Sequence, residues 1–252
     1  MATCNICGKT VEPLISFPTG TKVCNGCARA HGLALPSMPA DENIILAPES
    51  RIYMLDRDLS FTGAPSEPAD VAHWRDEWTR FCKEVFREDV DLSDIRIPLN
   101  PGGYDWVLFL LPWMTQNRLW TRCKDAFGGH SDLGDDLDKV VPTHERKVTD
   151  GAYAIRIRPN AEVDEELKNR SAIWINQQKR MTMTLPERLV LEPWYSWKFN
   201  DHLDRKNITL CAGSRSSGGR VPSVDWRGGG LCVRGLDPDD SRGGLRARAA
   251  VS

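Results

Sequence analysis

Four cysteines near the start constrain this chain more than any other feature of its 252 residues. They fall as Cys4-x2-Cys7, then 16 residues, then Cys24-x2-Cys27. Thiols spaced by two residues can close around one ion, and four thiolates complete the tetrahedral coordination of zinc without an open position. The spacing therefore predicts one structural Zn²⁺ bound by Cys4, Cys7, Cys24 and Cys27. Redox dithiols and disulfides are the alternatives.

The residues around these cysteines fit a small metal-stabilised fold. Pro18-Thr19-Gly20-Thr21 can turn a hairpin, and the segment from Cys27 to His31 can begin a helix that Gly32 closes. The arrangement over residues 1–35 resembles a treble-clef or zinc-ribbon finger. We interpret His31 as a surface side chain rather than a ligand in place of one of the cysteines.

The charge of this segment bears on what it contacts. Lys9, Lys22 and Arg29 stand against Glu12, which leaves +2, and a zinc ion with four thiolates cancels that charge. Nucleic-acid binding draws its affinity from a cationic surface. We therefore favour a structural or protein-contacting finger over one that reads nucleic acid.

The rest of the chain divides into a proline-rich linker with short strands, 36–65, and a mixed α+β domain, 66–252. With 40% hydrophobic residues and a net charge of −2 over its 252 residues, the chain can bury a core. The most apolar run, Trp106 to Trp113, has the length of a strand and not of a membrane span. Because the first residues lack the pattern of a secretory signal, we expect a cytoplasmic protein without membrane contact.

Hydrophobic periodicity predicts the elements of the α+β domain. From Pro68, apolar residues including Trp74, Trp78 and Phe81 recur at helical spacing, which indicates the core face of a helix rather than an exposed stacking platform. The further expected elements are strands over 104–111, 153–158, 208–211, 224–226 and 231–233, and helices over 114–127, over 162–170 and from Thr184 to a break or kink at Pro193. The last two strands form a C-terminal hairpin across three glycines.

Two of these expectations concern charged residues. Arg156 and Arg158 alternate with apolar residues, so we expect them on a solvated sheet face. In the segment 162–170, acid-before-base pairs such as Asp164 with Lys168 predict a solvated helix.

Several sequence segments in the last hundred residues resemble an uncharacterised family of bacterial hypothetical proteins. The resemblance rests on 151–154, 164–168, 185–189, 207–215 and 245–252, together with the upstream segment 135–139, and the sequence departs from the family at 193–200 and 227–235. That family has no assigned activity, so the resemblance implies a bacterial domain and no functional residue.

Several clusters could carry chemistry. Asp132, Asp135, Asp136 and Asp138 could bind a divalent ion, but the pattern of a calcium loop is absent, and a solvated acidic loop explains them. Glu145-Arg146-Lys147 has the Glu-x-Lys spacing of some metal-dependent nucleases. A metal-dependent hydrolase or nuclease that uses acids of the 132–147 region is accordingly the alternative function.

The segment 213–252 could bind nucleic acid, because it holds seven arginines and nine glycines against four aspartates. Its glycine-serine run, 213–220, lacks the lysine of a phosphate-binding loop, and we interpret it as a turn.

Of the other cysteines, we expect Cys82 and Cys123 in the core, whereas Cys211 and Cys232 could meet on adjacent strands and form a second metal or thiol site. Taken together, the sequence favours a zinc-binding accessory or interaction protein with a macromolecular partner, more readily a protein than a nucleic acid.

Overall fold

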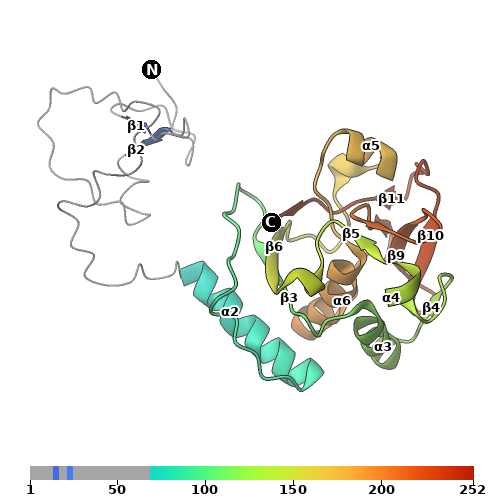
Figure 1. Cartoon of the computed structure of the whole chain (residues 1–252), viewed down its shortest axis with the longest axis horizontal. Helices are drawn as coiled ribbons and strands as arrows, with labels where there is room; N and C mark the ends of the chain where they lie inside the picture. The colour runs from blue at the N-terminus through green and yellow to red at the C-terminus, as the bar shows by residue number, and fades with distance from the viewer. Residues whose placement is uncertain (1–13, 17–21, 25–68) are drawn as a thin grey trace, which may run out of the picture. The chain divides into compact units, whose positions relative to one another are not determined.

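The computed structural model describes residues 14–16, 22–24 and 69–252, and its contacts divide the chain into two units, Met1–Glu67 and Pro68–Ser252 (Figure 1). In the first unit, β1 (Leu14–Ser16) pairs antiparallel with β2 (Lys22–Cys24), so that Leu14 lies opposite Cys24. This pairing is the hairpin expected around Pro18-Thr19-Gly20-Thr21. The turn itself, the predicted helix at Cys27 and the linker 36–65 lie outside the described residues.

The second unit is a mixed α+β fold, as the sequence predicts. Its helices are α2 (Ala69–Phe81), α3 (Gln116–Phe127), α4 (Leu137–Val140), α5 (Ala172–Gln177) and α6 (Leu185–Phe199), with a π-helical turn η2 (Cys82–Phe86) after α2 and short 3₁₀ turns η3 (Val148–Asp150) and η4 (Glu165–Leu167). None of the helices in this part of the chain combines the length and the apolar character that crossing a bilayer requires.

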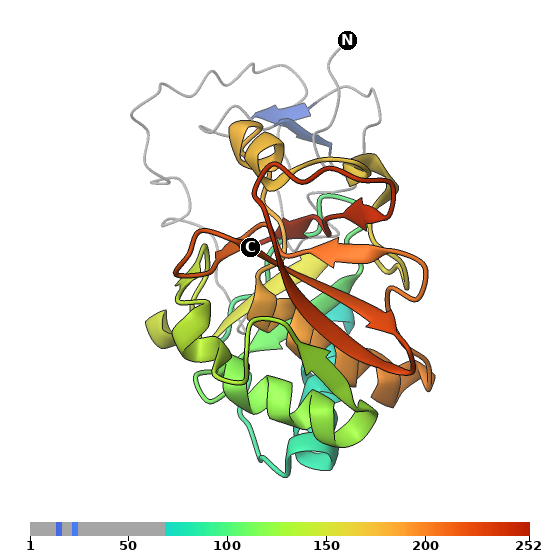
Figure 2. The same cartoon turned by 90° about the vertical axis from the view of Figure 1, so that its right-hand side faces the viewer.

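The strands of this unit form three sheets. A five-stranded sheet has the order β11-β7-β9-β10-β4, a three-stranded sheet the order β12-β6-β3, and β5 pairs with β8. Figure 2 looks onto the five-stranded sheet, whose later strands are drawn in orange and red. The strand bounds are β3 (Trp106–Leu110), β4 (Gly129–Ser131), β5 (Thr143–His144), β6 (Tyr153–Ile157), β7 (Ile208–Leu210), β8 (Ser214–Arg215), β9 (Val221–Arg227), β10 (Gly230–Leu236), β11 (Leu245–Arg246) and β12 (Ala250–Val251).

The C-terminal hairpin of β9 and β10 is confirmed, with Arg227 opposite Gly230 at its tip. Gly228 and Gly229 connect the strands with φ of 62° and 84°, a left-handed conformation that glycine adopts without steric cost. The glycine-serine run between β8 and β9 is likewise a turn.

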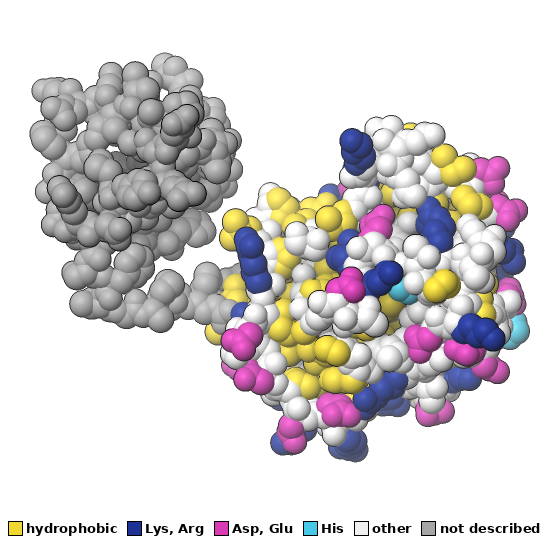
Figure 3. All heavy atoms as spheres, in the orientation of Figure 1, with side chains coloured by type: hydrophobic (Ala, Val, Ile, Leu, Met, Phe, Trp, Pro, Cys, Tyr) yellow, Lys and Arg dark blue, Asp and Glu magenta, His cyan; other side chains and the backbone are white. Residues whose placement is uncertain are grey.

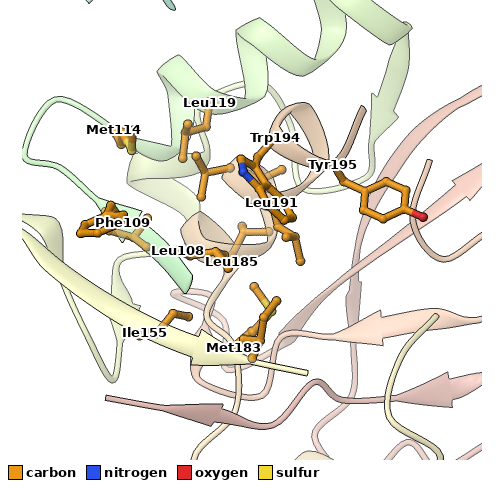
Figure 4. Packing of buried hydrophobic residues seen from close by; sticks show 14 of the residues in the cluster. Leu108, Phe109, Met114, Leu119, Ile155, Met183, Leu185, Leu191, Trp194 and Tyr195 are labelled. Carbon is orange, nitrogen blue, oxygen red and sulfur yellow. The ribbon is translucent and has the colours of Figure 1, made fainter. Parts of the chain in front are cut away.

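Helix α6 is the centre of the hydrophobic core. Every residue from Leu185 to Tyr195 is buried, and the helix packs on α3, β3 and β9. Figure 4 shows Leu191 and Trp194 of α6 among Leu119 of α3, Leu108 of β3 and Ile155 of β6. The predicted core face of α2 is confirmed, since Trp78 and Phe81 are fully buried and Trp78 stacks parallel to Trp194 with ring centroids 6.2 Å apart.

The sequence predicts a break or a kink of the helix at Pro193, and α6 does not break there. A proline lacks the N–H that would bond to the carbonyl four residues earlier, here that of Leu189. The thiol of Cys123, on α3, lies 3.5 Å from this carbonyl oxygen and donates to it. Packing of α6 between α3 and the sheets, together with this replacement donor, lets the helix continue to Phe199.

Two other expectations were wrong. Arg156 is buried rather than solvated, because residues 96–104 cover that face of β6 and its guanidinium donates to the carbonyl of Pro98 at 2.6 Å. The segment 162–170 forms only the short turn η4. Its Asp164 is buried, pairs with Arg158 at 3.1 Å and accepts from the backbone N–H of Ala249, so tertiary contacts replace the expected helical pairs.

Candidate functional site

Of the predicted zinc ligands, Cys4, Cys7 and Cys27 lie outside the described residues. The backbone of Cys24 ends β2, at the edge of the hairpin. A zinc finger over residues 1–35 therefore stays a prediction. Within the described residues, no three histidine, cysteine, aspartate or glutamate side chains come together as a metal-binding group.

The acidic residues of the 132–147 region organise the loop around α4. Asp138 accepts hydrogen bonds from the backbone N–H groups of Gln116 and Asn117, at 2.8 and 3.3 Å, and so caps the start of α3. Asp136 accepts from the backbone of Lys139 and from the side chain of Asn117. These hydrogen bonds lower the pKa of Asp136. The two carboxylates thus hold α3 and α4 together through helix caps.

The later cysteines do not form the second site that the sequence left open. Cys211 follows β7 and is buried, whereas Cys232 lies on β10 opposite Asp225, with β9 between their strands. Burial raises the pKa of the Cys211 and Cys123 thiols, and it raises that of Cys82 to about 12. Thiols with raised pKa values are poor nucleophiles at neutral pH.

The arginines of the C-terminal segment are largely neutralised within the fold. Arg234 and Arg227 lie 2.5 and 3.2 Å from the carboxylate of Asp225. Arg248 is buried and lies 2.6 Å from Asp204, which also pairs with Arg188 of α6 at 2.9 Å. These ion pairs remove much of the positive field that a nucleic-acid surface would need.

A groove lies beside β6 in the second unit. Its volume is about 680 Å³, within the range of small-molecule pockets. It lies between the segment that covers β6, the loop after β5 and the strand β12, and we call it the β6 groove. Its lining consists of Arg96, Pro98, Leu99, Glu145, Arg146, Lys147, Asp150, Gly151, Ala152, Tyr153, Ala154, Val251 and Ser252.

The floor of the β6 groove is fixed by a buried carboxylate. Glu187, the third residue of α6, is completely buried and accepts from Nε of Arg146 at 2.7 Å, from a terminal nitrogen of Arg146 at 2.9 Å and from the hydroxyl of Tyr153 at 3.1 Å. Its second oxygen also accepts from the backbone N–H of Thr184, at 2.7 Å, which completes a capping box at the start of α6. Arg146 and Tyr153 are therefore held from behind the groove.

Charge and burial set the protonation of this floor. Burial alone would lower the pKa of Arg146, but the Glu187 carboxylate more than offsets it, so the pKa is raised and the guanidinium stays charged. Burial, reinforced by Glu187, raises the pKa of the Tyr153 phenol, which stays protonated. Burial also raises the pKa of Glu145, against the effect of Arg146, 3.7 Å away. The floor is thus a fixed hydrogen-bonded layer.

The rim of the β6 groove differs from its floor. Arg96 and Lys147 are exposed, and within 69–252 neither has an ion-pair partner. Leu99, also in the lining, is 83% exposed, far more than any other large hydrophobic side chain in this part of the chain. In Figure 3, hydrophobic side chains gather on the face where β6 and the C-terminal residues lie in Figure 1.

The sequence did not point to the β6 groove. Its residues come from three segments, near 96–99, 145–154 and 251–252, and only the folded unit brings them together. The spacing of Glu145 and Lys147 is that of some metal-dependent nucleases, and in the structure both residues line the groove. An exposed Leu99 flanked by Arg96 and Pro98 has no periodic signal that a sequence pattern could detect.

Comparisons with known proteins return no relative: no family model matches the chain, no curated protein is significantly similar to it, and no solved structure matches it. The resemblance to bacterial hypothetical proteins therefore stays a prediction, and the function must be argued from the residues themselves.

Proposed function

We propose that this chain is a zinc-binding interaction protein whose α+β unit binds a protein partner in the β6 groove. One observation carries the proposal: the groove presents an exposed leucine and two basic side chains without ion-pair partners among residues 69–252, above a floor that is locked by Glu187. Exposed apolar side chains within a polar border are typical of docking surfaces.

The chemistry of the floor favours binding over catalysis. A general acid or base needs a titratable atom that can reach a ligand and exchange a proton near neutral pH. The hydroxyl of Tyr153 and the guanidinium of Arg146 both donate to Glu187, and both keep their protons. These groups shape the groove and hold its electrostatic field.

The zinc part of the proposal rests on the spacing of Cys4, Cys7, Cys24 and Cys27. The β1–β2 hairpin supports it, since a short hairpin beside one cysteine pair is common in such fingers. A segment of this size gains its stability from the metal rather than from a large core. Because thiolate ligands persist in a reducing compartment, we also propose a cytoplasmic location.

Elemental mass spectrometry on chain purified without added metal tests the zinc site. We expect one zinc per chain, which a C4S/C7S variant loses while a C82S variant keeps it. Absence of zinc from the wild-type chain would refute this part of the proposal. Two zinc ions per chain would reveal a further site elsewhere.

Site-specific photocrosslinking tests the partner. A benzoylphenylalanine replaces Leu99 in the groove or, as a matched control, the exposed Lys206 outside it. Irradiation in the producing cells should give a discrete protein adduct from position 99 and none from position 206. Identical patterns from both positions would show that the groove has no partner of its own.

A further inference from the structure

We infer that the ligand of the β6 groove is a short acidic peptide segment of the partner, with carboxylates on Arg96 and Lys147 and an apolar side chain against Leu99. This inference rests on the proposed function and specifies the chemistry of its partner. It follows from which charges around the groove are already neutralised, from the kind of apolar surface beside them, and from the rigidity of the floor.

Most basic side chains near the groove already have partners. Arg146 pairs with Glu187, and Arg158, beyond the far end of β6, lies 3.1 Å from Asp164. Arg96 and Lys147 differ, because both are exposed and neither pairs with an acid within 69–252. Unpaired cations that border one concave site raise the local positive potential and attract anionic groups.

The positive rim extends beyond these two residues. Ser252, in the lining, donates its hydroxyl to the sulfur of Met181 at 3.2 Å, so Met181 borders the groove. Its neighbour Arg180 is exposed and has no ion-pair partner among the described residues. Since Glu187 already neutralises Arg146, the three cations Arg96, Lys147 and Arg180 stand against two carboxylates of the lining, Glu145 and Asp150. The rim therefore carries an excess of positive charge.

The apolar surface at the groove is aliphatic rather than aromatic. Leu99 and Met181 are 83% and 40% exposed, and the half-buried Val251 lies on the edge strand β12 beside β6. The aromatic ring of the lining, Tyr153, directs its hydroxyl at Glu187. Single-stranded nucleic acids bind through bases stacked on exposed rings, whereas aliphatic side chains suit the apolar residues of a peptide. The surface thus favours an acidic peptide.

The floor is held by hydrogen bonds within the chain. Glu187 holds Arg146 and Tyr153 in place, and Arg156 ties β6 to the carbonyl of Pro98, which precedes Leu99. A preformed site loses little conformational entropy on binding. Binding should therefore depend on the rim side chains, and it should weaken as salt screens their charges.

Selection of phage-displayed random peptides on the full zinc-loaded chain tests the inference. The peptides that are enriched should carry excess Asp and Glu around an apolar residue. Measured by fluorescence anisotropy, the Kd of such a synthetic peptide should rise on the order of tenfold in R96E/K147E and several-fold in L99A. The control K206E/R242E makes the same charge change at exposed basic residues outside the groove and should leave the Kd nearly unchanged.

A charge exchange separates loss of binding from loss of folding. A version of the peptide with Lys in place of its acidic residues should bind R96E/K147E better than it binds the wild-type chain. Enriched peptides that are not acidic, or that bind R96E/K147E unchanged, would overturn the inference and leave the proposed function intact. Enrichment of no peptide would count against the protein partner itself. Groove-dependent binding of a uridine oligonucleotide would instead assign the site to nucleic acid.

Discussion

The thiol of Cys123 donates to the backbone carbonyl of Leu189, 3.5 Å away. Within α6 this carbonyl would otherwise lack a donor, because Pro193 has no N–H. A donor on α3 thus repairs the hydrogen-bond ladder of the central helix. The relationship explains why a buried, chemically unreactive cysteine lies at the contact between two core helices.

We expect C123V to destabilise the chain by about 1–3 kcal/mol, because valine fills the site and leaves a buried carbonyl without a donor. Urea unfolding measures the change. In P193A, residue 193 regains an N–H that can bond to Leu189, so C123V should cost less in that background. Equal costs in both backgrounds would show that the thiol does not replace the proline donor.

Thiol reactivity should separate the four cysteines of the second unit. The pKa of all four thiols is raised, but Cys82, Cys123 and Cys211 are buried, whereas Cys232 is partly exposed and within reach of a reagent. Brief treatment with iodoacetamide near neutral pH, followed by peptide mass spectrometry, should therefore modify Cys232 alone among these four. All four should react in urea. Rapid labelling of Cys211 in the folded chain would contradict the described burial.

Removal of the Glu187 carboxylate should strongly destabilise the folded chain. E187A leaves Arg146 without its buried partner and removes the acceptor of Tyr153, so we expect a loss of about 3–5 kcal/mol. E145A, its exposed neighbour in the groove, serves as the control and should change stability by less than about 1 kcal/mol. Comparable losses in the two variants would show that the floor does not depend on Glu187.

Stability should fall in mild acid through His144. Burial lowers the pKa of this imidazole below its ordinary 6.5, so between the two pKa values the unfolded chain binds a proton that the folded chain excludes. The stabilisation is complete above pH 6.5 and is lost as the pH falls below that value. The neutral ring also lets Nδ1 accept from the hydroxyl of Ser214, at 2.8 Å.

Urea midpoints of wild-type and H144N chains at pH 7.5 and 5.5 measure this effect. The wild-type chain should lose more stability between these two pH values, with a slope of at most about 1.4 kcal/mol per pH unit for one proton. Parallel losses in both chains would assign the pH dependence to other groups.

Local patterns predicted much of the second unit because they report burial directly. The stripe of Trp74, Trp78 and Phe81 indicated α2, the alternating residues of 153–158 indicated β6, and the glycines at 228–230 indicated the β9–β10 hairpin. Each signal depends on neighbours within a few residues.

The errors arose where distant residues decide the structure. The alternation of apolar and basic residues predicted a solvated Arg156, because a local alternation cannot show that the distant residues 96–104 cover this side chain. Asp164 and Lys168 have the spacing of a helical ion pair. In the structure, the Asp164 carboxylate instead pairs with Arg158 and accepts a hydrogen bond from the backbone N–H of Ala249. The β6 groove stayed hidden for the same reason, since its three segments are far apart in the sequence.

The position of β12 has a consequence for the order of events during synthesis. Ala250 pairs with Ile157 of β6 and also donates to the carbonyl of Met181, while Arg248 completes the buried cluster at Asp204. A nascent chain that still holds these residues inside the ribosome lacks β12, the strand that contacts both β6 and the segment at Met181. The second unit should therefore complete its fold only after residues 245–251 emerge from the ribosome.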